Sequence, residues 1–423
     1  MVATAAIPAT NEVMLDASGI PLKVALARAE RSKRTKAFLL VVPLLILILI
    51  SFIFPILQML FRSVDNPAIY DNLPNLSREI QKWDEQSVPD ETLFALLADD
   101  LRAATVLKNQ GKAATRLNYD APGSRSMITS TARKLKKKKE GPYKDWLIKT
   151  HKGWGKLSTW VALKKASQQY TLGFYLNSLD FRYSETGEIV SQPENLQIYG
   201  KLFKRTFIVS VAITVICVLL AYPISFLMAT LKLRTSNLLM IMVLLPFWTS
   251  LLVRTTSWIV LLQREGTLND LMVYFGFIDH ESRLQMIYNM TGTVVAMTHI
   301  LLPFMVLPLF SVMKTIPPSY MRAARSLGAN PAYAWWKVYM PLTVPGVAAG
   351  SVLVFILSVG YYITPALVGG QSGTLISNLI AFHMQKSLNW GLAAALGSVL
   401  LTGILLLYWA YNRVIGIDKM KMG

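Results

Sequence analysis

The chain has 423 residues, of which 53% are hydrophobic, and its formal net charge is +19. The apolar residues come in long blocks almost free of charges, which excludes an ordinary soluble domain. Because about 20 consecutive apolar residues cross a bilayer, the sequence predicts an all-α membrane protein with six transmembrane helices. The predicted spans are 37–61, 206–231, 238–262, 284–313, 338 to beyond 362, and 387–412.

The first span follows a basic segment that contains Arg31, Lys33, Arg34 and Lys36. Short segments rich in Lys and Arg stay in the cytoplasm, so residues 1–36 are expected to be a cytoplasmic tail. The apolar run is longer than the core of a signal peptide, which is about 7–15 residues. We therefore expect an uncleaved span over 37–61.

Residues 62–200 then fall outside the cytoplasm. They begin acidic and turn strongly basic, with "RKLKKKKE" at 133–140. "ETLFALLADDLRAATVL" and "DWLIKTHKGWGKLSTWVALKK" have helical apolar spacing. The sequence predicts a small, mostly helical extracytoplasmic insert with a disordered basic hinge near 120–142. The lysine run fits a solvated or lipid-facing surface better than nucleic acid, which would be absent on that side.

The later loops agree with one topology. The link at 232–234 and the link from 314 to 337 are basic, whereas 264–288 carries Glu265, Asp270, Asp279 and Glu281. The first two are therefore expected inside and the third outside. This divides the chain into a five-helix transmembrane core over 201–415, with a cytoplasmic loop at 314–345, and a cytoplasmic tail at 416–423.

The stretch "RAARSLGANPAYAWWKVYMPLTVPG" (322–346) predicts two short helices inside that loop. Pro317, Pro318 and Ser319 supply a start, with serine as a cap. Gly328 ends the first helix in the left-handed conformation. Asn330 and Pro331 start the second helix, and Pro341 is expected to end or kink it.

This pattern resembles the EAA loop of permease subunits of type I ABC importers. The family motif runs Glu-Ala-Ala, a short spacer, Gly, and later a Leu-Pro pair. The matching positions here are Ala323, Ala324, Leu327, Gly328, Pro331 and Pro341, with Arg322 where the family has glutamate. The resemblance implies a MetI-like permease fold in which this loop couples to an ATPase, and the arginine puts the usual polar contact in question.

Two further segments, "LPFWTSLLVRTTSWIVLLQREGTLNDLM" (245–272) and "YYITPALVGGQSGTLISNLI" (361–380), look like spermidine/putrescine-type permeases. Relatives that carry opines, amino acid derivatives or aminophosphonates share them. The chain has no G-x-x-x-x-G-K-[ST] motif of its own. The family therefore implies a non-enzymatic subunit that binds no cofactor, while partner ATPase subunits use ATP and Mg²⁺. It also implies a second permease subunit, giving a heterodimer, and a periplasmic solute-binding protein, all at the bacterial inner membrane.

Candidate residues for a substrate pathway are polar or aromatic groups near span ends. Arg254 is either functional, as charges in membranes often are, or extends to the headgroups. Aromatic rings attract organic cations but also anchor helices at the interface. "PALVGGQSG" (365–373) either lines a cavity mouth or forms an external turn. The set is Trp248, Thr249, Arg254, Tyr361, Tyr362, Thr364 and Asn378.

Two other classes of protein stay open at this point. A secondary transporter would need no ATPase, although its usual intramembrane acids are missing from the predicted spans. A membrane-anchored interaction protein would use the basic insert. The four histidines are scattered and Cys217 stands alone, so the sequence predicts no metal site. The insert is expected to dock a binding protein or shield an outer gate.

Overall fold

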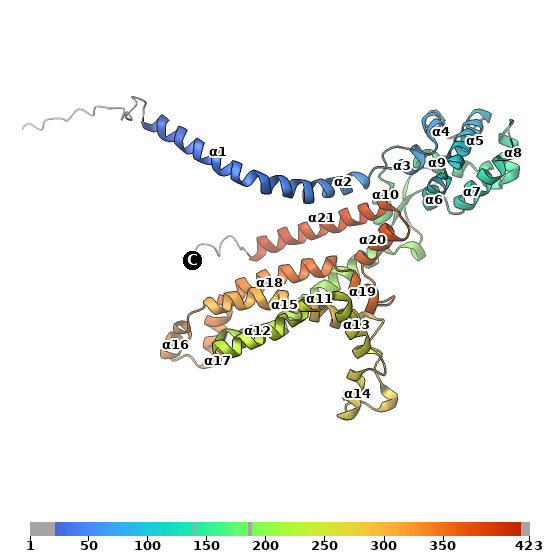
Figure 1. Ribbon diagram of the computed structural model, residues 1–423. Helices are drawn as coiled ribbons and strands as arrows, with labels where there is room; N and C mark the ends of the chain where they lie inside the picture. The colour runs from blue at the N-terminus through green and yellow to red at the C-terminus, as the bar shows by residue number, and fades with distance from the viewer. Residues whose placement is uncertain (1–21, 139, 185–187, 416–423) are drawn as a thin grey trace, which may run out of the picture. The chain divides into compact units, whose positions relative to one another are not determined.

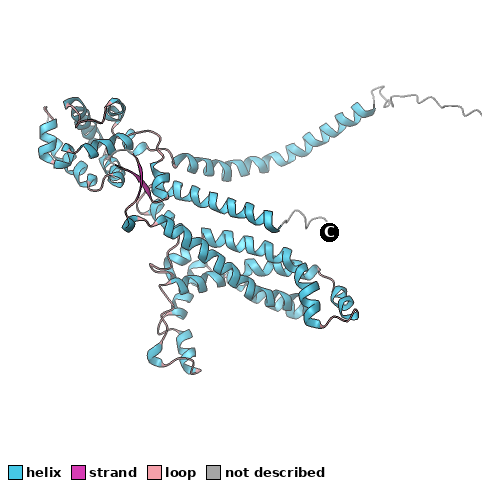
Figure 2. Cartoon of the chain, turned by 180° about the vertical axis from the view of Figure 1, so that it is seen from behind, coloured by secondary structure: helices cyan, strands magenta, loops and turns pink. Residues whose placement is uncertain are grey.

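The computed structural model describes residues 22–138, 140–184 and 188–415. Most of these residues are helical, as the sequence predicts, and the described chain contains one two-stranded sheet (Figure 2). They form two units, 1–61 and 62–423. The predicted tails at 1–36 and 416–423 lie partly or wholly outside the described residues.

The first unit is one long helix. It consists of α1 (Leu22–Ile48), a π-helical turn η1 (Leu49–Ile53) and α2 (Phe54–Arg62). The stretch Glu30–Arg62 is long and apolar enough to cross a membrane, which confirms the first predicted span. Its apolar side chains are largely exposed, Leu40 by 84%, which suits a helix surrounded by lipid.

The insert is a small helical domain with a β-hairpin. Strands β1 (Phe181–Tyr183) and β2 (Ile189–Ser191) pair antiparallel, with Arg182 opposite Val190. Its helices are α3 (Pro67–Tyr70), α4 (Pro74–Glu79), η2 (Ile80–Lys82), α5 (Glu91–Val106), α6 (Gln110–Asp120), α7 (Ser124–Leu135), α8 (Lys144–Thr150), η3 (Lys152–Gly155), α9 (Leu157–Ala166), α10 (Gly173–Ser178) and η4 (Glu194–Leu196).

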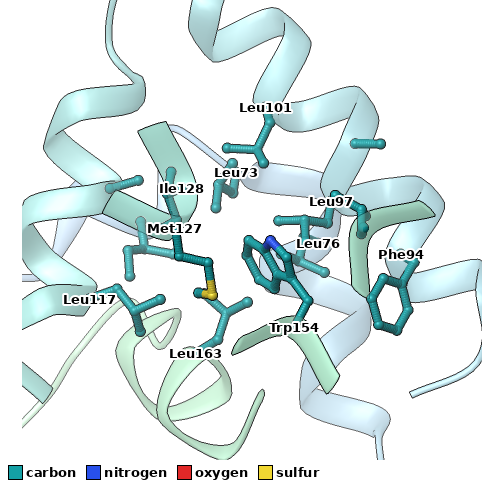
Figure 3. Close-up of a cluster of buried hydrophobic side chains, with 14 of the residues drawn as sticks. Leu73, Leu76, Phe94, Leu97, Leu101, Leu117, Met127, Ile128, Trp154 and Leu163 are labelled. Atoms are coloured by element: carbon teal, nitrogen blue, oxygen red, sulfur yellow. The ribbon is translucent and has the colours of Figure 1, made fainter. Parts of the chain in front are cut away.

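The core of the insert lies around Trp154 (Figure 3). The Trp154 indole is fully buried and donates a hydrogen bond from Nε1 to Thr131 Oγ1 at 2.9 Å. Trp160 donates to the Trp154 carbonyl and packs its ring 4.6 Å from that of Phe94. Leucines from α4, α5 and α9 surround these rings. Because both buried indole N–H groups have a partner, the packing around Trp154 and Trp160 favours one arrangement of the short helices.

The prediction of a disordered hinge near 120–142 is wrong over most of this segment. Residues 124–135 form helix α7, which buries Met127, Ile128, Thr131 and Leu135. These residues follow the 3.6-residue helical period and face the core, while the lysine and arginine side chains of α7 face outward. The first basic residues of the charge run, Arg133 and Lys134, therefore belong to the solvated side of an ordered helix.

The second unit continues with the membrane helices. They and their connections are α11 (Tyr199–Thr230), α12 (Leu233–Trp248), α13 (Leu251–Leu262), α14 (Thr267–Tyr274), η5 (His280–Ser282), α15 (Met290–Thr315), α16 (Pro318–Ser326), α17 (Pro331–Ala334), η6 (Trp335–Tyr339), α18 (Met340–Gly360), α19 (Ile363–Val368), α20 (Ile376–Gln385) and α21 (Trp390–Ile415).

Helix α15 packs against both α11 and α18 along their length (Figure 1). Close approach depends on small residues: a Cβ on Gly346 of α18 would lie 3.1 Å from Leu309 Cα of α15. Cys217 is buried in the same cluster, with its Sγ 3.7 Å from the Thr298 carbonyl. This packing of small residues is typical of helices in membranes, and Cys217 has the predicted packing role.

Two predicted spans need correction. The third span is not one straight helix, because Leu233–Trp248 and Leu251–Tyr274 bend by 100° at the break between them. Counting this pair as one span gives six in the described chain, and otherwise five. The fourth span begins at Met290 and not at 284, since Asn289 Oδ1 accepts a hydrogen bond from Gly292 N and caps the helix.

The end of the insert is joined to the start of α11 by one carboxylate. Asp180 accepts hydrogen bonds from the backbone N–H groups of Ile198 and Tyr199 at 3.1 Å, and from Gly200 at 2.7 Å. These are free donors at a helix N-terminus, where a negative charge is also favoured by the helix dipole. Asp180 therefore fixes the point at which the insert passes into the membrane helices.

Candidate functional site: the loop between two membrane helices and the broken third span

The loop 314–345, called the linking loop below, contains the predicted two helices. Helix α16 begins at Pro318, and Pro317 occupies the cap position without a side-chain cap. The expected cap by Ser319 is therefore wrong, because Ser319 already lies inside the first turn. Proline suits this position, since its missing N–H group would have no helical partner there.

Gly328 ends α16 as predicted. Its φ of +88° is left-handed, and no atom lies within 4 Å of a Cβ built there. Gly328 N donates to the Arg325 carbonyl at 3.0 Å, and Ala329 N donates to the Ala324 carbonyl at 3.1 Å. These two bonds form a Schellman motif. The glycine is thus required by backbone conformation and not by crowding.

The second helix of the loop starts at Pro331, after Asn330 Oδ1 accepts a hydrogen bond from Tyr333 N at 2.7 Å. It does not end at Pro341. The helix runs on as Pro331–Gly360, with a π-helical turn at Trp335–Tyr339. A π-turn widens the helix by one residue and is a common way to accommodate an interruption of its hydrogen bonds. Of the two predicted outcomes at Pro341, an end of the helix is therefore wrong, and the interruption takes the form of the π-turn just before it.

One side of the linking loop packs on the membrane core. The Trp335 ring lies 5.7 Å from that of Tyr222, and the Tyr339 ring lies 5.3 Å from that of Phe226, both edge to face. Tyr222 Oη is 3.1 Å from Thr343 Oγ1. Aromatic pairs in this geometry add to the energy of simple burial, so the second helix is held firmly against α11.

The opposite side of the linking loop is exposed and largely apolar. Leu327 at the tip is 89% exposed, and Tyr320, Tyr333 and Trp336 are each at least half exposed. Ala323 shares this side, whereas Ala324 is half-buried on the side of Met321. The two alanines therefore do not share one outward face. Large exposed apolar groups side by side are typical of a surface that another protein covers.

Arg322 and Arg325 are exposed on α16, and the described residues provide neither with an ion pair. The surface they border is therefore basic as well as apolar. Such a surface is complementary to a partner that presents carboxylates, and not to one that presents the basic groups expected opposite a glutamate.

Arg254 lies just after the break in the third span. Its guanidinium donates to the Pro246 carbonyl and, at 3.0 Å, to the Thr249 carbonyl. These carbonyls end α12, where the last carbonyl groups lack backbone N–H donors and carry a partial negative charge. Ser250 Oγ, in turn, accepts from Val253 N and caps α13. Arg254 thus stabilises the break, a role that neither of its two sequence-based interpretations included.

The other pathway candidates fall into two groups. Trp248 is 76% exposed at the end of α12. The second group surrounds the start of α19, where Asn378 donates to the Tyr362 carbonyl at 2.7 Å. Thr364 is buried, with its hydroxyl 3.5 Å from that of Thr255. Asn378 and Thr364 therefore make internal hydrogen bonds, whereas the Trp248 side chain is exposed.

Tyr361 is half-buried, and its carbonyl accepts a hydrogen bond from Ser377 Oγ at 3.0 Å. His299 Nδ1 accepts a hydrogen bond from Trp258 Nε1 at 3.1 Å. Sequence reasoning did not connect His299 with Trp258, although both lie in apolar segments where a polar group needs a partner. The segment 365–373 packs on the start of α15, where Thr293 Oγ1 lies 3.5 Å from the Gly373 carbonyl.

Metal binding has no candidate in the described part of the chain, where no group of three His, Cys, Asp or Glu side chains converges. An exposed apolar and basic surface lies on the loop between α15 and α18, and the third span is broken between α12 and α13. Together they describe a helical, multi-spanning membrane protein with a surface of the kind that another protein covers.

Comparison with known proteins identifies the family of this chain. Residues 221–415 match the family "Binding-protein-dependent transport system inner membrane component". The chain is 32% identical over 221 residues to the spermidine/putrescine transport system permease protein PotB of Haemophilus influenzae, covering 52% of this chain and 77% of that protein. It therefore belongs to this family, and it is an ABC importer permease and a multi-pass protein of the inner membrane. The insert lies before the matched residues.

Two other similarities were found. The inner membrane ABC transporter permease protein YdcU of Escherichia coli is 31% identical over 261 residues, covering 58% of this chain and 81% of that protein. A solved bacterial alginate ABC transporter, in complex with an alginate pentasaccharide-bound periplasmic protein, contains a chain with a TM-score of 0.45 and 16% identity. That comparison covers 51% of this chain and 78% of the other.

Proposed function

We propose that this chain moves a polyamine, of the spermidine or putrescine type, through the inner membrane. The observation that supports this substrate is the 32% identity to a permease named for spermidine and putrescine, 77% of which is covered by the comparison. The aromatic side chains of Trp248 and Tyr361, near the broken span, suit organic cations. Arg254 is a positive charge near this span, and its guanidinium is directed at the Pro246 and Thr249 carbonyls that end α12.

In this proposal the linking loop faces the cytoplasm and the exposed side around Leu327 docks on a partner ATPase. The partner binds ATP and Mg²⁺, and this chain binds no cofactor. ATP-driven closure of the ATPase pulls the loop, and the flanking helices α15 and α18 tilt. The basic links at 232–234 and 314–337 support the cytoplasmic side for both loops, and for both termini.

The other proposed partners are a second permease subunit, which completes the translocation path as a heterodimer, and a periplasmic solute-binding protein. The insert, placed in the periplasm, docks that binding protein or shields the outer gate. Its connection to α11 through Asp180 supports a mechanical role. Deletion of residues 70–195 with unchanged uptake would exclude this role for the insert.

Uptake of radiolabelled spermidine and putrescine tests the substrate. Cells lacking their own polyamine uptake would express this chain with its partner subunits, and ATP-dependent accumulation is expected. A cell expressing the same partners without this chain is the control. Failure to accumulate either polyamine, with accumulation of an opine, amino acid derivative or aminophosphonate, would reassign the substrate and keep the importer class. Transport by the purified chain alone without ATP would instead indicate a secondary transporter.

A further inference from the structure

The insert contains a cavity of about 780 Å³ that the proposed transport mechanism does not use. It lies among the turn from α6 to α7, the segment from η3 into α9, and the β-hairpin. All of its lining residues belong to the insert. The volume falls in the range of small-molecule pockets, which is about 300–1,000 Å³.

The charges around this cavity are unbalanced. Lys152, Lys156, Lys165 and Arg182 line it, and none of these four has an ion-pair partner in the described part of the chain. Asp120 is the acid among the described lining residues, and Arg116 already neutralises it with an N–O distance of 2.6 Å. The cavity therefore attracts anions and repels polyamines.

Lys165 gives the cavity a specific anchor. Its ammonium nitrogen is inaccessible to solvent and has no hydrogen-bond partner among the described residues. It lies 4.9 Å from the centroid of the Tyr183 ring, which compensates only part of the charge. Burial of an ammonium group without a partner is costly. An anion in the cavity would supply the missing hydrogen bonds and charge.

Two helices also begin at the cavity. Gly123 and Ser124 at the start of α7, and Lys156 and Ser158 at the start of α9, are lining residues. Neither helix is capped by the side chain of its own N-cap residue, although Asn118 Oδ1 accepts a hydrogen bond from Arg125 N of α7 at 3.2 Å. Helix N-termini carry partial positive charge and free N–H groups, and they often bind phosphate. Two such ends add to the four side-chain cations.

From these observations we propose that the insert cavity binds a small phosphate-bearing anion, with Lys165 and Arg182 as its principal ligands. Several cations and two helix starts favour a phosphate group, which carries more charge and more acceptor oxygens than a single carboxylate. The phosphate comes from a soluble organic phosphate or from an anionic lipid headgroup. This site does not depend on the polyamine assignment.

Equilibrium dialysis of the full chain tests the site. The protein is reconstituted in phosphatidylcholine nanodiscs, and radiolabelled glycerol 3-phosphate is the probe. Saturable binding is expected, and it should weaken as the salt concentration rises. Lys165→Gln and Arg182→Gln each remove a charged ligand, so each should weaken binding by about tenfold. Lys112→Gln, an exposed lysine outside the cavity, is the matched control and should bind as the unmodified chain does.

A second arm identifies the source of the phosphate. In nanodiscs that contain phosphatidylglycerol, loss of glycerol 3-phosphate binding would identify the lipid headgroup as the occupant. Retained binding would identify a soluble phosphate. Arg182 is exposed, so its variant should fold normally even if Lys165→Gln does not. Absence of saturable glycerol 3-phosphate binding in phosphatidylcholine nanodiscs, or equal binding by Arg182→Gln and the control, would overturn the proposal.

Discussion

Leu327 provides a direct test of the proposed docking surface. The side chain is 89% exposed at the end of α16, and none of the described residues covers it. Complete burial of a leucine side chain contributes about 1.5–3 kcal/mol. If a partner ATPase covers Leu327, the substitution Leu327→Ala should therefore weaken its binding by roughly 10- to 150-fold.

Leu107→Ala is the matched control for this experiment. Leu107 is also the C-cap residue of a helix, α5, and is 70% exposed, but it lies in the insert. Binding of the co-expressed ATPase to each variant in nanodiscs is measured by surface plasmon resonance, and ATP-driven uptake is measured in parallel. Leu327→Ala should lose affinity and uptake, and Leu107→Ala should keep both. Equal ATPase affinity for the two variants would refute the assignment of this surface.

Four further changes test other parts of the structure. Gly328→Ala strains a left-handed residue by roughly 1–2 kcal/mol and should reduce uptake, whereas Gly276→Ala, with φ +73° and equal space, should not. Arg254→Met should lower both the melting temperature and uptake, since it removes hydrogen bonds at the helix break. Lost uptake with unchanged melting would place Arg254 in the pathway. Asp180→Ala should destabilise the start of α11 by about 1–2 kcal/mol, seen as faster amide hydrogen exchange there; equal exchange would contradict its capping role. Burial raises the pKa of the Asp100 carboxyl, so the insert should lose stability as the pH rises from the ordinary carboxyl range through that pKa. In a pH series of melting curves, Asp100→Asn should flatten this dependence, and an unchanged slope would refute it.

Local signals in the linking loop were readable from the sequence. Gly328 adopts a positive φ because the chain turns back there, and Asn330 before Pro331 forms a cap from its own side chain. Both depend on residues adjacent in the chain. The helix does not end at Pro341, because the effect of a proline on a helix depends on the preceding turn. Here that turn is the π-turn at Trp335–Tyr339, and the helix continues through it.

The break in the third span had no comparable signal. Pro246 precedes it, but Pro223, Pro303 and Pro345 lie inside helices that continue. Proline alone therefore does not locate a break. Arg254 stabilises this one by reaching back over the bend. The insert cavity could not be predicted from the sequence either, because Lys152, Lys165 and Arg182 come together only when the helices and the hairpin pack.

The two helices of the linking loop are attached to the membrane core in different ways. The second helix is part of one continuous element, Pro331–Gly360, and its aromatic side chains pack on α11. The first helix, by contrast, is separated from α15 by the non-helical Ile316 and Pro317 and from α17 by the Gly328 turn. A displacement of the second helix must therefore displace the start of α18, because a helix transmits force along its hydrogen-bonded axis. Displacement of the first helix can be absorbed at either end. The proposed pull of an ATPase thus reaches the membrane chiefly where the ATPase contacts the exposed side of the second helix, at Tyr333 and Trp336. From there it passes into α18, where Gly346 and Gly350 allow close sliding contact with α15.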